Sequence, residues 1–124
     1  MNVLIIDQSE CERSIFRGIL RSLPVGDIAE AGEPADALAV LRSFDADLTV
    51  LPAETAETEP GKQFIDSFCT ARPSAGLIII HRSDAPPSQP PSHAVMLPRP
   101  FSRITVAEAI HSASAKRGSA NKAA

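Results

Sequence analysis

The hydrophobic positions of this chain fall into five short apolar runs separated by longer amphipathic stretches. Apolar runs without polar alternation are typical of strands covered on both faces of a parallel sheet. The predicted strands lie in NVLII, DIAEA, DLTVL, residues 77–80 and HAVML. DIAEA is more polar than the others and is expected at an edge of the sheet.

The first amphipathic stretch predicts a helix that begins after Ser9. A serine at this position can accept a hydrogen bond from the first turn, and the acidic Glu10 and Glu12 favour the same end of a helix. The apolar positions that follow recur at helical spacing and predict one buried stripe. They are Ile15, Phe16, Ile19, Leu20 and Leu23.

The same periodicity predicts three further helices. One begins near Pro34, a second follows an acidic loop and a Pro60-Gly61 turn, and the last is capped by Ser102 or, three residues later, by Thr105. Their expected buried positions are, in order, Leu38, Leu41 and Phe44; Phe64, Ile65, Phe68 and Cys69; and Ile104, Ala107 and Ile110. The final KRGSANKAA predicts a frayed tail.

Strands that alternate with helices predict an α/β fold with a doubly wound, five-stranded parallel sheet. The fourth crossover breaks this alternation. SDAPPSQPPSH carries Pro86, Pro87, Pro90 and Pro91, and each proline inside a helix costs about 3 kcal/mol. We therefore expect an extended, polyproline-like loop in place of the fourth helix.

Composition narrows the functional classes. A chain of 124 residues is one domain, and a net charge of −3 gives no reason to expect nucleic acid or an anionic membrane as a partner. No apolar stretch approaches the ~18 residues of a membrane span, and the N-terminus lacks the basic region of a signal peptide. A cytoplasmic protein is expected. Cys11 and Cys69 form no metal-binding or redox spacing and are expected to be buried free thiols.

Four short motifs follow one another in a fixed order. Asp7-Gln8-Ser9 follows the first predicted strand, with Arg13 close behind; DLTVL runs into Pro52; Pro60-Gly61 lies in the next loop; and Arg99-Pro100-Phe101-Ser102 precedes the last helix. In this order, and over residues 3–115, the chain resembles the receiver domain of two-component response regulators, the CheY-like, flavodoxin-like family. The resemblance implies sheet order 2-1-3-4-5, a receiver-like domain in residues 1–116 and a tail in residues 117–124.

The resemblance also implies which residues carry the chemistry of the family, and here the chain departs from it. Receivers hold Mg²⁺ with acids while an aspartate takes the phosphoryl group. Asp7 keeps the first acid, whereas the second acid, the phosphoacceptor, the hydroxyl and the lysine are replaced by Gln8, Pro52, His81 and Arg99, and Met96 stands at the aromatic switch position. We therefore predict a pseudo-receiver without a metal or other cofactor, and not an enzyme.

The leading functional hypothesis is a stand-alone receiver of phosphorelay signalling that acts by protein–protein interaction without phosphorylation. Its partner would be a signalling protein, such as a sensor histidine kinase or another regulator, and a homodimer is possible. The family uses the face built by its fourth helix, fifth strand and fifth helix. The expected contact residues are the four prolines of the loop together with Arg103, Glu108 and His111.

Two other functions stay open. A small-ligand sensor would hold an anion or nucleotide in the vacated pocket around Asp7, Gln8, His81 and Arg99. An unconventional phosphoacceptor would use Asp7 or a histidine. The two differ from the leading hypothesis in a direct way, because one predicts stabilisation by a ligand and the other predicts a covalent phosphoryl group.

Several residues have alternative interpretations. Arg99 is expected to pair with Asp7, while Glu54 is either a solvated glutamate or a mimic of a phosphoryl charge beside Arg99. His81 and His93 flank the proline loop and would bind a metal only if they met an acid such as Asp84. The spacing from Pro87 to Pro90 also matches a PxxP ligand.

Overall fold

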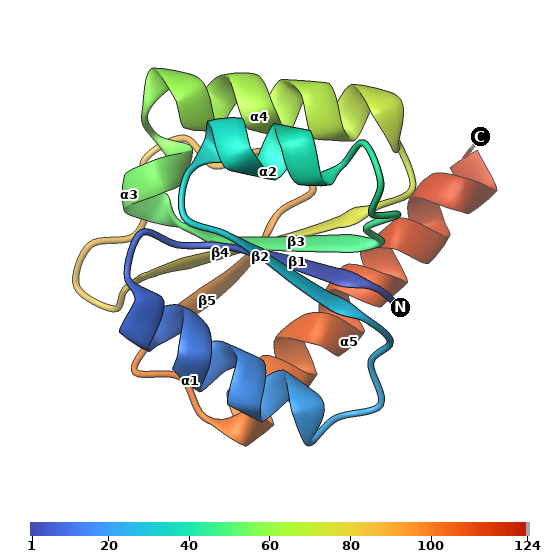
Figure 1. Cartoon of the computed structure of the whole chain (residues 1–124). Coiled ribbons are helices and arrows are strands. Elements are labelled where there is room, and N and C mark those ends of the chain that lie inside the picture. Colours follow the sequence, from blue (N-terminus) through green and yellow to red (C-terminus); the bar gives the residue numbers. More distant parts are fainter. Residues whose placement is uncertain (124) are drawn as a thin grey trace.

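A sheet of five parallel strands forms the middle layer of the molecule (Figure 1). This computed structural model describes the backbone of residues 1–123 and the side chains of residues 1–115. The strands are β1 (Val3–Ile6), β2 (Ile28–Ala31), β3 (Leu48–Pro52), β4 (Gly76–Arg82) and β5 (Val95–Arg99). They lie in the order β2-β1-β3-β4-β5, so the predicted topology is confirmed and the polar DIAEA run is an edge strand.

Helices cover both faces of this sheet. The helices are α1 (Glu10–Arg21), α2 (Pro34–Val40), α3 (Ala53–Ala56), α4 (Glu59–Ala71) and α5 (Arg103–Ala123). In Figure 1, α2 and α4 lie above the sheet and α1 and α5 lie below it. No helix in the described part of the chain has the length and apolar character that crossing a membrane requires.

Two apolar clusters, one on each side of the sheet, explain why the strands read as unbroken apolar runs. Leu4 and Ile6 pack on the side of α2 and α4, whereas Val3 and Ile5 pack on the side of α1 and α5. Because successive side chains of a strand point to opposite faces, a strand covered on both faces needs an apolar residue at every position.

Three residues that the periodicity placed in the core are exposed instead. Ile15 is 55% exposed, Leu38 38% and Ile104 67%. In each helix a neighbouring residue occupies the inner position, namely Phe16, Ala37 and Val106, all of which are at most 1% exposed. The α2 helix is also shorter than expected, so Phe44 packs against the core from the loop that follows it. The expectation that both cysteines are buried is wrong for Cys11, which is exposed in the first turn of α1, and holds only in part for Cys69, which is partly buried; both are free thiols.

The acidic loop after β3 contains a helical turn that the sequence analysis missed. Pro60 and Gly61 belong to the first turn of α4 rather than to a separate turn, and Thr58 caps that helix by accepting a hydrogen bond from the Gly61 amide at 3.1 Å. At α5 the expected cap is confirmed. Ser102 and Thr105 exchange amide-to-hydroxyl hydrogen bonds of 2.8 and 3.3 Å, which is a capping-box arrangement.

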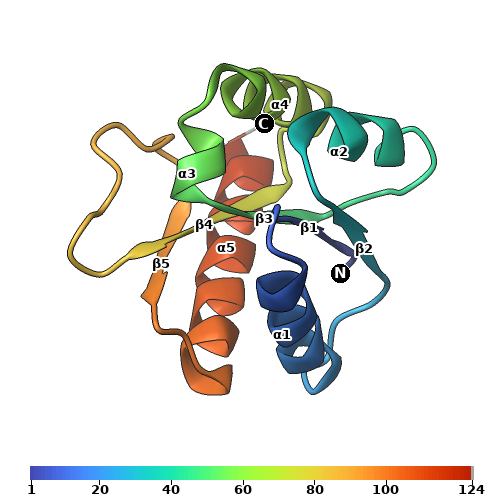
Figure 2. The same cartoon turned by 60° about the vertical axis from the view of Figure 1, so that its left-hand side comes forward.

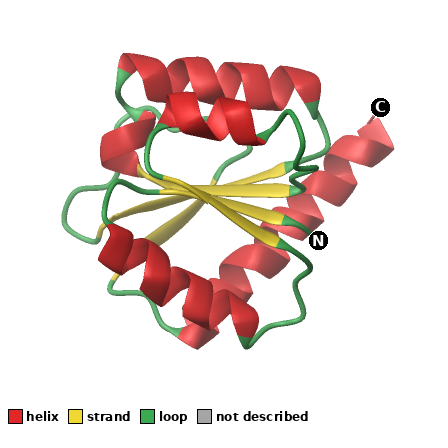
Figure 3. Cartoon of the chain, in the orientation of Figure 1, coloured by secondary structure: helices red, strands yellow, loops and turns green. Residues whose placement is uncertain are grey.

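The crossover between β4 and β5 has no helix in the described structure, as its four prolines predicted (Figure 3). Residues 83–94, which we call the crossover segment, form loops and turns. At the other end of the domain, the backbone of α5 takes in residues 117–123, which the sequence analysis had assigned to a frayed tail. Ala124 lies outside the described residues.

Candidate functional site

The residues predicted to form a receiver-like pocket come from neighbouring strand ends. Asp7 follows β1, Pro52 ends β3, and Arg99 ends β5 beside β4. The carboxyl ends of parallel strands meet at one edge of a sheet, where ligands usually bind. The fold therefore brings these positions to one edge, although they lie far apart in the sequence.

Asp7 is buried behind this edge, with 6% of its surface exposed. Its Oδ1 accepts a hydrogen bond of 2.9 Å from the Ser9 amide. Burial raises the pKa of the Asp7 carboxyl, the Ser9 hydrogen bond lowers it, Glu12 raises it and Arg99 lowers it, and the result is a pKa above the ordinary value. The Asp7 carboxyl is therefore harder to ionise than an ordinary aspartate.

Arg99 is the positive centre of the site, and it binds two glutamates at once. Its Nε donates to Glu12 Oε1 at 3.1 Å, and its Nη1 donates to Glu54 Oε1 at 3.0 Å. Burial lowers the pKa of Arg99, but the hydrogen bonds to Glu54 and Glu12 outweigh this effect and leave the pKa above its ordinary value. Arg99 is therefore a permanent cation with two carboxylates of the same chain as partners.

These contacts correct the expected partner of Arg99 and show where Glu54 lies. The predicted ion pair of Arg99 with Asp7 is replaced by the pairs with Glu12 and Glu54. Glu54 does lie beside Arg99, and it reaches it because the helical turn α3 follows β3 directly. The side chain of Glu54 remains 60% exposed, so water screens this pair.

Pro52 is accommodated because it belongs to both β3 and the start of α3. It is buried, pairs with Ile80 of β4, and acts as the N-cap residue of α3 with φ of −75° and ψ of 152°. The proline ring fixes φ near this value and supplies no amide donor. A rigid, apolar residue therefore ends β3, at the position where the sequence resemblance places a phosphoacceptor.

The other predicted pocket residues point to different surroundings. His81 is 7% exposed, and its Nδ1 lies 2.7 Å from the carbonyl oxygen of Arg82. Met96 packs against the apolar cluster on the side of α2 and α4. Gln8 is exposed and lines a cavity of about 450 Å³ together with Glu33 and Glu54. The predicted ligand pocket consisted of Asp7, Gln8, His81 and Arg99. These residues do not line one common cavity, because Gln8 and Arg99 line two different ones.

These positions do not fit Mg²⁺. The ion prefers several oxygen ligands in octahedral geometry, but Pro52 offers no side-chain oxygen and Asp7 Oδ1 is engaged by Ser9. Within the described residues, no group of three or more His, Cys, Asp or Glu side chains is arranged to hold a metal. The hypothesis of a site built from His81, His93 and Asp84 fails the same geometric test, and Asp84 instead pairs with Arg82 at 3.0 Å.

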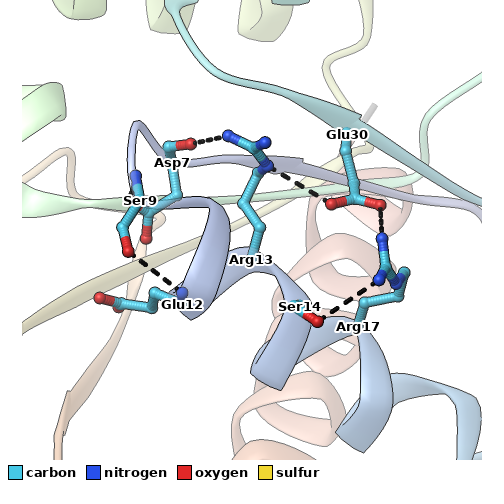
Figure 4. Close-up of polar contacts among 7 residues, drawn as sticks. All are labelled: Asp7, Ser9, Glu12, Arg13, Ser14, Arg17 and Glu30. Atoms are coloured by element: carbon cyan, nitrogen blue, oxygen red, sulfur yellow. Dashed lines mark hydrogen bonds and ion pairs between the residues drawn. The ribbon is translucent and has the colours of Figure 1, made fainter.

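A polar cluster behind Asp7 was missed by the sequence analysis (Figure 4). Arg13 donates to the backbone oxygen of Asp7 at 2.5 Å and pairs with Glu30 at 3.4 Å, and Arg17 also binds Glu30. The spacing of Arg13 and Arg17 by one helical turn was the available signal. A second signal was Glu30, an acid that lies between two alanines of β2. The cluster joins α1 to the edge strand and fixes the loop that holds Asp7.

A groove of about 830 Å³ opens beside Arg99 on the side of α1. Its walls include Glu12 and Ile15 of α1, Arg82 at the end of β4, and Arg99 and Phe101 before α5. Phe101 packs edge-on against Phe16 with ring centroids 5.3 Å apart, and the Arg99–Pro100 peptide bond is cis. The groove combines an apolar wall with two arginines that already have acidic neighbours.

The expected interaction residues are distributed over two surfaces. Glu108 and His111 are exposed on α5. Arg103 is exposed too, but it donates hydrogen bonds to Ser22 Oγ at 3.0 Å and Ser22 O at 3.1 Å at the end of α1. Pro86 and Pro90 are exposed, whereas Pro87 and Pro91 are partly buried.

Solved structures similar to this one include receiver domains. The receiver domain of the PhyR response regulator from Erythrobacter litoralis is 22% identical, and the match covers 90% of this chain and 88% of that chain with a TM-score of 0.69. A response regulator receiver protein from Sinorhizobium medicae is 18% identical, and the match covers 97% of this chain and 96% of that chain with a TM-score of 0.73. The chemotaxis response regulator CheY4 of Vibrio cholerae is 16% identical, and the match covers 89% of this chain and 95% of that chain with a TM-score of 0.72.

At these identities the comparisons define the fold, and the chain has the fold of response-regulator receiver domains. The resemblance seen in the sequence is confirmed at that level. No protein-family model matches the sequence, and no curated protein is similar to it.

Proposed function

We propose that this receiver-fold domain is a signalling module that binds another protein of a bacterial phosphorelay and does so without being phosphorylated. One observation carries the proposal: the position of the phosphoacceptor is a buried proline, and the neighbouring cation is held by the chain's own glutamates. A phosphoryl group would have neither an attacking carboxylate nor a free cation at this edge. A location in the cytoplasm and a kinase or regulator as partner belong to the same proposal.

The proposal predicts that the conformation does not respond to a phosphodonor. Amide chemical shifts of the labelled protein would be recorded before and after adding Mg²⁺ and acetyl phosphate, with an ordinary receiver as control. We expect the spectrum to stay unchanged while the control shifts widely. Shifts that spread from the strand ends into α5 would refute the proposal.

The groove beside Arg99 favours a second candidate, a sensor of a small anion. Its volume of about 830 Å³ lies within the usual range for ligand sites, and two arginines line it. Inorganic phosphate and a nucleoside diphosphate are suitable probes in a thermal shift assay. A gain in melting temperature that Arg99→Ala abolishes and that Arg82→Ala reduces would favour the sensor. No gain with either probe would remove it.

An unconventional phosphoacceptor is the third candidate, with Asp7 or a histidine as the modified residue. Asp7 is 6% exposed, and His81 is 7% exposed, so neither is open to a phosphodonor in this conformation. Intact mass after incubation with acetyl phosphate and Mg²⁺ decides this candidate, because a covalent phosphoryl group would add to the mass.

A further inference from the structure

The middle of the outer face of α1 has no charged side chain. Figure 2 shows α1 on the outside of the molecule, below the sheet and beside α5. The exposed residues along the middle of this outer side, which we call the α1 face, are Cys11, Ser14, Ile15, Gly18 and Ser22. The solvent side of an amphipathic helix is ordinarily charged, and the exposed side of α4 carries Lys62 and Asp66. Depletion of charge is instead characteristic of the buried core of a protein interface.

Ile15 is the large apolar residue of the α1 face. Its side chain is 55% exposed, because Phe16 occupies the inner position of the helix. Ile15 also lines the groove beside Arg99, together with Phe101. Covering apolar surface of this kind with another molecule gains about 25 cal/mol per Å², so the α1 face favours a protein contact at Ile15.

Gly18 indicates a close approach from outside the chain. Glycine inside a helix is less favourable than alanine by about 1 kcal/mol. Nothing within the described chain requires a glycine here, because its φ is not positive and a Cβ atom would meet nothing within 4 Å. Ser14 lies one helical turn away and is small as well. A second helix could therefore approach these two residues at the short end of the usual interaxial range of about 8–10 Å.

The charges beside the α1 face have opposite signs at its two ends. Glu10 is exposed in the first turn of α1, and Arg21 is exposed in the last turn. The two residues are about three helical turns apart, so they lie on the same flank of the helix. When two copies of α1 are packed antiparallel about a two-fold axis, Glu10 of each copy faces Arg21 of the other. The charges are thus complementary to those of a second copy of the same helix.

We propose that the α1 face is the interface of a homodimer in which two copies of α1 pack antiparallel. The backbones come closest at Ser14 and Gly18, and Ile15 of one copy packs beside Ile15 of the other near the two-fold axis. Ion pairs between Glu10 and Arg21 flank this contact twice, because an isologous interface uses the same residues on both copies. One helix from each copy makes a small interface, so the dimer is weak and concentration-dependent. The inference does not rest on the proposed signalling role.

A charge exchange tests the proposal by sedimentation equilibrium of the full chain in reducing buffer, between about 10 μM and 1 mM. We expect a monomer–dimer equilibrium whose Kd rises about tenfold or more in Glu10→Arg and in Arg21→Glu, since each change places like charges together twice. The variant with both changes should return to within about threefold of the original Kd, because the pairs form again with their signs exchanged. A chain that is monomeric at every concentration, or a combined variant as weak as the single ones, would overturn the proposal.

Ile15→Lys tests the apolar contact separately. It should abolish the dimer, because two lysines would then meet near the two-fold axis. Leu38→Lys is the matched control, since Leu38 is also an exposed apolar residue but belongs to α2, on the other side of the sheet. Circular dichroism would show that both variants are folded. Equal dimerisation of the two variants would overturn the assignment of the α1 face.

Discussion

At the scale of single residues, the chemistry of the Arg99 side chain has a definite consequence. A guanidinium group is planar and presents donors in several directions, and here it reaches Glu12 on α1 and Glu54 on α3 simultaneously. An ammonium group is a compact point charge and lacks this two-sided reach. Arg99 therefore joins three elements at the edge where receivers place a metal ion and a phosphoryl group.

The contribution of Glu54 can be measured by Glu54→Gln. We expect a fall in the free energy of unfolding of at most about 1 kcal/mol, because the glutamate is more than half exposed and screened by water. The fall should shrink at high salt. Chemical denaturation at two salt concentrations would test this, with Glu57→Gln as the control. No difference between the two variants at low salt would contradict a role for the pair.

Asp7→Asn should stabilise the protein at neutral pH, because the buried carboxylate is harder to ionise in the folded state than in the unfolded state. With the folded pKa above the ordinary value of 3.8, the folded state keeps its proton to higher pH. Wild-type stability from this group is therefore lost as the pH rises from about 3.8 through the folded pKa. Asparagine keeps the oxygen that accepts from Ser9.

The measurement is the melting temperature of both proteins across this pH range. We expect the advantage of Asp7→Asn to grow with rising pH and then to become constant. An advantage that is largest in acid would contradict a raised pKa of Asp7.

At the scale of elements, Gly61 allows α4 to follow α3 without a longer loop. A Cβ atom at this position would lie 1.9 Å from the carbonyl oxygen of Thr55, a distance that no real contact permits. The helical turn that carries Glu54 and the helix that carries Cys69 therefore both depend on a residue without a side chain.

Gly61→Ala should destabilise the domain by about 1–3 kcal/mol, the usual range for overpacking. Gly18→Ala is its matched control, since a Cβ there meets nothing within 4 Å. Because alanine is the better helix former, this second change should stabilise α1 by up to about 1 kcal/mol. Thermal denaturation of the two variants would decide, and equal melting temperatures would contradict the close approach of α3 and α4.

The bonds from Arg103 to Ser22 change how the α5 surface should be probed. Arg103→Ala should lower the free energy of unfolding by about 0.5–1 kcal/mol, because α1 loses a hydrogen-bond donor at its end. Glu108→Ala, on the same helix, should have a smaller effect. Loss of partner binding would then be ascribed to the α5 surface only if Glu108→Ala also causes it. Equal stability of the two variants would contradict the contact between α5 and α1.

The strands and long helices were predictable from the sequence, and the reasons are physical. The runs at β1, β3 and β4 are mostly apolar because both faces are covered, although Thr49 of β3 is a buried polar residue. Periodicity was less accurate about which residue faces inward, since a stripe two residues wide fits Ile15 as well as Phe16. The four-residue α3 was too short to show any period, and its presence depends on Gly61.

The candidate site was predictable only in part. Its positions followed from the order of the motifs, because parallel strands place their ends together. The partners of Arg99 did not follow, since the contact with Glu12 joins residues 87 positions apart and depends on how α1 and β5 pack. The approach of His93 Nε2 to Cys69 Sγ, which lie 3.1 Å apart, was also not predictable, because the path of a proline-rich loop has no periodic signal.

At the scale of the whole molecule, the chain has the receiver fold, and the edge at the carboxyl ends of its strands carries a paired cation, a proline and a buried acid. Arg99 is bound by glutamates, Pro52 fills the central position and Asp7 is held in the interior. In place of a crossover helix, the crossover segment forms the surface next to α3 and α4. Both features leave the sheet intact, and both are what the proposed function, binding without phosphoryl transfer, requires.

The most direct test of this account is the intact mass of the protein after incubation with acetyl phosphate and Mg²⁺, beside an ordinary receiver. We predict no change in mass under conditions that phosphorylate the control, because no attacking carboxylate lies at the end of β3. A stable gain of one phosphoryl group would contradict the central claim. Fragmentation would then identify the modified residue, and Asp7 and the histidines would be the first to be considered.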